Sequence, residues 1–147
     1  MVSQVLKTLY SRELDRLRKE IELYNTESKI WYIEKSIANS AGNLCLHLIG
    51  NLNTYIGKEL GGSGYVRNRE LEFSLKDVPR IELLKMIDDT KRMVESTLDS
   101  LSPQQLQDEY PLLVYETKMP TGAFLTYLTT HLSYHLGQIN YHRRLLD

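Results

Sequence analysis

Histidine is the residue type in this sequence best suited to chemistry at a defined site, and it occurs only four times. The four are His47, His131, His135 and His142. His131 and His135 are four positions apart in a segment with helical spacing, so on a helix they lie about 40° apart around the axis and about 6 Å apart along it. Two imidazoles placed in this way can bind one metal ion, as the helical H-x-x-x-H pair of zinc proteases does.

The residues around this pair argue against a protease. Leu132 follows His131, so the carboxylate of the protease motif is absent. His142 lies about 10.5 Å beyond His135 along the axis, which is too far to complete the same coordination sphere. We expect His142 to be structural or to face a substrate. Gln138 shares the stripe of the pair and is a candidate for a hydrogen bond to the metal ligands or to the substrate.

A third metal ligand must come from another helix, and the segment from about Ser40 to Leu60 offers one. Apolar residues surround most of this segment, which predicts a buried helix. Its polar stripe consists of Asn43, His47, Asn51 and Thr54. An unsatisfied buried polar group costs about 1–3 kcal/mol, so the stripe either forms a structural network or lines a cavity. His47 is the natural third ligand, and Asn43 is a further candidate for a hydrogen bond to the ligands or to the substrate.

Two interpretations of the histidines follow. Three protein nitrogens with an open fourth position would make a catalytic metal site, whereas a structural zinc site is closed by four protein ligands. A single histidine on an apolar helix is, however, more often a hydrogen-bonded core residue than a ligand. An H-x-x-x-H pair also arises by chance in many helices.

Four long helices must position these residues. Apolar residues recur at helical spacing in the segments from Val2 to about Tyr24, from about Ser40 to Leu60, from Pro79 to about Leu101, and from Thr121 to the end of the chain. Four such helices with two sizeable connections predict an all-α fold, a four-helix bundle that forms one domain over residues 1–147.

The connections carry the turn-forming residues. The glycine-rich stretch at positions 61–64 should end the second helix, and a loop with solvated Arg67 and Arg69 should follow it. A short helical turn is expected from Ile30 to about Ile37, and another after Ser102. Thr121 is expected to cap the last helix.

Composition excludes several classes of protein. Eighteen Lys and Arg residues against nineteen Asp and Glu residues give a net charge of −1, which argues against a protein that holds nucleic acid or an acidic membrane. The single cysteine, Cys45, excludes an internal disulfide and a cysteine-rich zinc module. No apolar stretch approaches the ~18 residues of a membrane span, and the first residues do not form a signal sequence. We expect a cytoplasmic protein that acts on a small molecule.

Two stretches of the sequence resemble the DinB-like superfamily. They are Asn43-Leu44-Cys45-Leu46-His47-Leu48 and His131-Leu132-Ser133-Tyr134-His135-Leu136-Gly137-Gln138. The superfamily includes the YfiT-type metal-dependent hydrolases and the bacillithiol- and mycothiol-dependent transferases. Its pattern has one histidine on the second helix and an H-x-x-x-H, often followed by x-Gly-Gln, on the last. The resemblance implies a bundle with up-down-down-up connectivity, a divalent metal held by the three matching histidines, and a homodimer.

Two classes of function follow from these observations. The first is an enzyme that uses Zn²⁺, Ni²⁺, Fe²⁺ or Mn²⁺ at His47, His131 and His135 to transfer a low-molecular-weight thiol, in a bacillithiol-type detoxification. The metal would hold the thiol as its reactive thiolate. Hydrolysis by a metal-activated water, as in the YfiT-type hydrolases, is the related alternative. The second class is a non-catalytic, stress-related dimer that binds a metal or another ligand.

Overall fold

The chain folds into helices joined by turns and loops. The computed structural model describes all 147 residues and contains no β-strand. The long elements are α1 (Val2–Leu23), α2 (Ala41–Leu52) with its π-helical continuation η2 (Asn53–Lys58), α4 (Arg80–Ser100) and α6 (Thr121–Leu146). The short elements are the 3₁₀-helix η1 (Glu27–Trp31), α3 (Arg69–Ser74) and α5 (Pro103–Gln107). The prediction of an all-α fold is confirmed. None of the helices combines the length and apolar character needed to cross a membrane.

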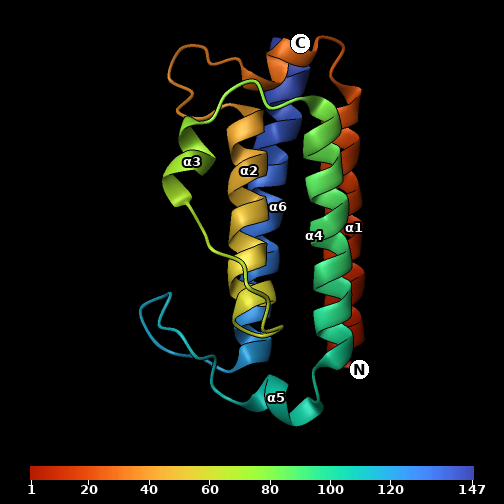
Figure 1. Cartoon of the computed structure of the whole chain (residues 1–147), viewed down its shortest axis with the longest axis vertical. Helices are drawn as coiled ribbons and strands as arrows, with labels where there is room; N and C mark the ends of the chain where they lie inside the picture. Colours follow the sequence, from red (N-terminus) through yellow and green to blue (C-terminus); the bar gives the residue numbers. More distant parts are fainter.

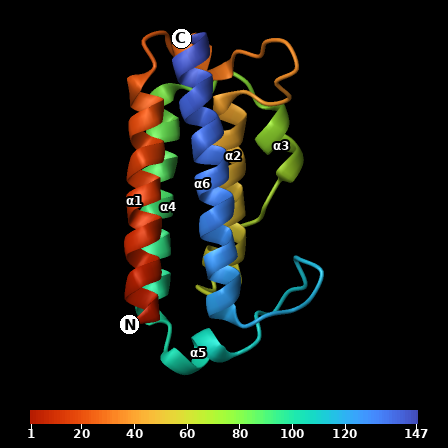
Figure 2. The same ribbon diagram turned by 180° about the vertical axis from the view of Figure 1, so that it is seen from behind.

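The four long segments lie side by side. Helices α1 and α6 run toward one end of the molecule, and α2 and α4 run toward the other (Figures 1 and 2). Helix α1 packs on α4 and α6, while α2 packs on α6, α4 and the short helix α3. Helix α3 covers the side of α2 that faces away from α1 (Figure 1). The DinB-like bundle with up-down-down-up connectivity stays a prediction.

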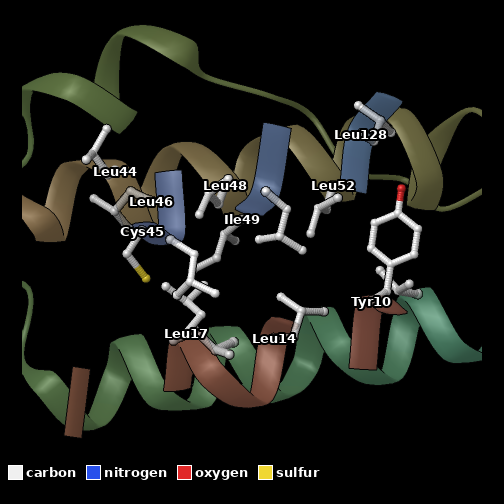
Figure 3. Close-up of a cluster of buried hydrophobic side chains, with 14 of the residues drawn as sticks. Tyr10, Leu14, Leu17, Leu44, Cys45, Leu46, Leu48, Ile49, Leu52 and Leu128 are labelled. Carbon is white, nitrogen blue, oxygen red and sulfur yellow. The ribbon is translucent and has the colours of Figure 1, made fainter. Parts of the chain in front are cut away.

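The hydrophobic core contains residues from all four long segments. Leu14 and Leu17 of α1 face the apolar side chains of α2, with Cys45 among them (Figure 3). Burial raises the pKa of the Cys45 thiol to about 12, so this cysteine is a neutral core residue. The hydroxyl of the buried Tyr10 donates a hydrogen bond of 2.6 Å to the backbone oxygen of Leu125, which joins α1 to α6.

Helix α2 is buried along its whole length. All of its residues, from Ala41 to Leu52, are buried. The Ser40 hydroxyl caps the helix by accepting a hydrogen bond from the backbone N–H of Asn43. A Cβ atom at Gly42 would lie 2.6 Å from the ring of Trp31, so glycine is needed for η1 to pack directly on α2. The helical path ends before Gly62, whose φ of +65° suits glycine.

Two connections and the start of α6 differ from the sequence-based prediction. The predicted loop around Arg69 contains α3, because the Asn68 side chain accepts the N–H of Leu71 and caps a helix with acidic residues in its first turn. The short helical turn lies at η1, earlier than predicted. Thr121 is the first helical residue and not the cap. Its hydroxyl instead donates a hydrogen bond to the backbone oxygen of Asp108.

The packing of α1 can be tested with two leucines of the same helix. Leu17 is fully buried, whereas Leu23 is 41% exposed. We expect Leu17→Ala to lower the free energy of unfolding by about 2–5 kcal/mol, because it leaves a cavity in the core. Leu23→Ala should change it by less than about 1 kcal/mol. Urea unfolding followed by circular dichroism measures both. Equal losses in the two variants would contradict the position of α1.

Candidate metal centre

Three of the four histidines come together between α2 and α6. Nε2 of His47 lies 3.2 Å from Nε2 of His131, and the ring centres of His131 and His135 are 4.6 Å apart. One ring nitrogen from each of the three lies within 4.8 Å of the others. Two nitrogens bound tetrahedrally to one zinc ion at 2.0–2.1 Å are about 3.3 Å apart. The donor types and the His47–His131 spacing therefore fit a divalent metal ion.

A buried carboxylate from α3 orients His47. Oε1 of Glu72 lies 3.0 Å from Nδ1 of His47, and the Glu72 residue is only 6% exposed. A carboxylate accepts hydrogen bonds, so the proton of His47 is on Nδ1 and the lone pair of Nε2 faces His131. Arg67 donates hydrogen bonds of 2.8 and 3.0 Å to the two oxygens of this carboxylate. The buried negative charge is therefore paired, which a stable fold requires.

Sequence reasoning missed both Glu72 and Arg67. The sequence predicts Arg67 to be a solvated loop charge, but its side chain is only 15% exposed and pairs with Glu72. Two signals could have pointed to them. Asn68 followed by acidic residues is typical of a helix start. Gly50, within a buried helix, indicates a close approach, since a Cβ there would collide with the Glu72 carboxylate.

His135 is oriented by a residue of its own helix. Oε1 of Gln138 lies 2.7 Å from Nδ1 of His135. The amide oxygen accepts the Nδ1–H, so the lone pair of His135 Nε2 is available to a metal. The structure therefore places Gln138 in contact with one of the three clustered histidines.

Asn43 and His142 are engaged in contacts that hold the fold. The side-chain amide of Asn43 donates a hydrogen bond of 2.9 Å to the backbone oxygen of Glu72, which fixes α3 on α2. Nε2 of His142 lies 2.8 Å from the backbone oxygen of Tyr32, and its Nδ1 lies 2.6 Å from the Tyr24 hydroxyl. A carbonyl only accepts, so Nε2 carries the proton and Nδ1 accepts from Tyr24. His142 thus ties the end of α6 to the connection after α1.

Burial favours the neutral form of two of the clustered rings, His131 and His47. The pKa of His131 is lowered to about 4, mainly by burial and to a smaller extent by the nearby His135 and His47. The pKa of His47 is also lowered, mainly by burial, although Glu72 opposes this effect. A metal binds the neutral imidazole through its lone pair. Both rings can therefore bind a metal at neutral pH without first losing a proton.

A cavity of about 570 Å³ opens beside His135 and Gln138. Its walls come from the connection before α2, from α2 itself and from α6. The apolar and aromatic lining residues are Ile37, Ala38, Leu44, Tyr134, Tyr141, Leu145 and Leu146. No Asp, Glu, Lys or Arg side chain lines it. A cavity of this size and character suits a small, uncharged and largely apolar molecule.

One protein family matches almost the whole chain, and the whole site lies within the matched residues. The family described as "Protein of unknown function (DUF1572)" matches residues 4–147. The three clustered histidines, Glu72 and Arg67 all lie inside this range. No curated protein matches the chain.

Two glycines allow a test of the contact between α2 and α3. A methyl group at Gly50 would push the Glu72 carboxylate away from His47, whereas at Gly137 it would enter open space. We expect Gly50→Ala to lower the free energy of unfolding by about 1–3 kcal/mol. Gly137→Ala should be neutral or stabilise the helix by up to about 1 kcal/mol. Urea unfolding tests this, and a Gly50→Ala variant as stable as the wild type would contradict the contact.

The low pKa of His131 predicts a loss of stability in acid. The unfolded chain protonates this ring near its ordinary pKa of about 6.5, while the folded chain does so only near 4. Between these values the unfolded state binds more protons, so the free energy of unfolding falls as the pH falls through this range. With chelator present, the wild type should lose more stability than His131→Gln between about pH 7 and pH 5. Equal losses would show that His131 does not contribute.

Proposed function

The chain belongs to the family described as "Protein of unknown function (DUF1572)", and we propose that it is a divalent-metal enzyme, a transferase that joins a low-molecular-weight thiol to a small acceptor. The convergence of His47, His131 and His135 carries this proposal. The protein supplies three nitrogen donors, which leaves a coordination position for a substrate. Catalytic zinc sites have this arrangement, whereas structural ones have four protein ligands.

The architecture belongs to the same proposal. We propose the DinB-like four-helix bundle with up-down-down-up connectivity, which the directions of α1, α2, α4 and α6 support (Figures 1 and 2). The homodimer and the cytoplasmic location that we expect from the sequence are also part of it. The exposed Tyr134 and Tyr141 of α6, which line the cavity beside His135, could contact a second copy of the chain.

The protein's own residues prepare the site for this chemistry. Glu72 and Gln138 each hold an Nδ1–H, which fixes His47 and His135 with their Nε2 lone pairs available. Zn²⁺, Ni²⁺, Fe²⁺ or Mn²⁺ bound there would lower the pKa of a coordinated thiol and hold it as the thiolate. The uncharged cavity beside His135 is the proposed site for the acceptor.

The proposed transfer balances without a further reactant. The thiolate sulfur forms a bond to an electrophilic carbon of the acceptor. The bond from that carbon to the leaving group breaks, and the leaving group departs with the electron pair. The thiol proton passes to the solvent. Apolar walls around the acceptor limit the access of water, which would otherwise compete with the thiol.

Metal content is the first test of this proposal. We expect elemental mass spectrometry of the tag-free protein to find about one divalent ion per chain, and none in the His131→Ala/His135→Ala variant, because one remaining imidazole cannot hold it. His142→Gln changes a histidine of the same helix whose nitrogens bind Tyr24 and Tyr32, so it should keep the ion. Circular dichroism verifies that each variant is folded. A wild type without metal after reconstitution would overturn the proposal.

Activity is the second test. The metal-loaded protein, mixed with bacillithiol and monochlorobimane as an uncharged electrophile, should form one thiol adduct per acceptor consumed. The double histidine variant should lose at least about 100-fold in rate, because it lacks the ion that activates the thiol. Turnover of an ester probe without any thiol would support the hydrolase instead. A bound metal with no turnover of either probe would support the non-catalytic alternative.

A further inference from the structure

Each histidine that binds a metal through Nε2 must carry its proton on Nδ1, and that proton needs an acceptor. Glu72 is the acceptor for His47, and Gln138 is the acceptor for His135. Nδ1 of His131 is buried and has no hydrogen-bond partner. An unpaired buried donor costs about 1–3 kcal/mol, and metal-binding histidines nearly always have a partner for the second nitrogen. The site therefore lacks one acceptor.

The facing helix carries a buried acceptor that is also unpaired. Oδ1 of Asn51 has no hydrogen-bond partner, and the residue is 6% exposed. Asn51 follows His47 by one helical turn on α2 and belongs to the same polar stripe, from which His47 contacts His131 of α6. Side chains tilt toward the N-terminus of their own helix, and α2 and α6 run in opposite directions. The Asn51 side chain therefore tilts along α2 toward His47, whose ring contacts His131, and the His131 side chain tilts in the opposite direction along the bundle.

The tautomers of His47 and His131 explain why Nδ1 of His131 and Oδ1 of Asn51 are both without a partner. The proton of His47 is on Nδ1, facing Glu72, so its Nε2 can only accept. The contact of 3.2 Å between the two Nε2 atoms then requires His131 to donate from Nε2. In that tautomer Nδ1 of His131 has no proton to offer to Asn51. A metal needs the lone pair of His131 Nε2, which moves the proton to Nδ1.

We infer that Asn51 is a positioning residue of the metal centre, whose Oδ1 accepts the Nδ1–H of His131 when a divalent ion is bound. The inference rests on the proposed metal site. With Asn51, each of the three histidine ligands has its own hydrogen-bond acceptor for Nδ1–H, one from α3, one from α6 and one from α2. Asn51 then fixes the tautomer and the ring orientation of His131 without touching the ion or a substrate.

Three variants test this role. Asn51→Ala removes the acceptor and should weaken Zn²⁺ binding about 10–100-fold, measured by competition with a chromophoric chelator. Asn51→Asp restores an oxygen acceptor at the same place and should bind Zn²⁺ at least as tightly as the wild type. Thr54→Val removes the other unpaired oxygen of the stripe, about one turn further along the chain in η2, and should leave the affinity unchanged.

Nitrogen NMR of the zinc-loaded wild type reports the position of the His131 ring proton, which a purely structural role of Asn51 would leave unchanged. We expect His131 to carry its proton on Nδ1, in slow exchange with water and close to the Asn51 side chain. The signal should persist in Asn51→Asp and exchange rapidly in Asn51→Ala. Zinc affinity in Asn51→Ala equal to that of Thr54→Val, or a wild-type Nδ1–H far from Asn51, would overturn the inference while the metal site stands. Absence of zinc binding by the wild type would overturn the proposed function and, with it, this role.

Discussion

The burial of α2 on all sides is the constraint on which the rest of the structure depends. A helix enclosed in this way cannot leave its polar side chains to water, and each unsatisfied group costs about 1–3 kcal/mol of a total stability of about 5–15 kcal/mol. Its neighbours supply partners for two of these side chains. Asn43 binds the backbone of α3, and His47 binds Glu72 of α3 and contacts His131 of α6. The polar stripe of α2 thus determines where its neighbours lie.

The pair formed by Glu72 and Arg67 couples the stability of the fold to the chemistry of the site. The carboxylate accepts hydrogen bonds from Arg67 and holds the proton of His47 in one position. Loss of either partner would leave a buried charge without compensation, which typically costs several kcal/mol. Gly50 makes this arrangement possible, because no other residue leaves room for the carboxylate against α2. The same contacts anchor α3 and prepare a ligand, so neither role can be changed alone.

Apolar periodicity predicted the long helices well. The structure has Val2–Leu23 where the sequence predicts a helix from Val2 to about Tyr24, and Arg80–Ser100 where it predicts one from Pro79 to about Leu101. A helix that buries one stripe must repeat its apolar residues with the helical period, so the sequence carries this information directly. Helix α3 was missed because its six residues are too few to show a period. Contacts with α2 stabilise it, through Asn43 and His47.

The sequence by itself determined the identity of the four histidines and the spacing of His131 and His135, because the geometry of one helix fixes the distances between its own side chains. It also indicated His47 as their partner, since no other helix carries a histidine. Only the tertiary structure decided which nitrogens face one another, that Glu72 and Arg67 complete the surroundings of His47, and that His142 joins Tyr24 and Tyr32. These contacts cross between elements far apart in the chain, and their distances depend on how the helices pack.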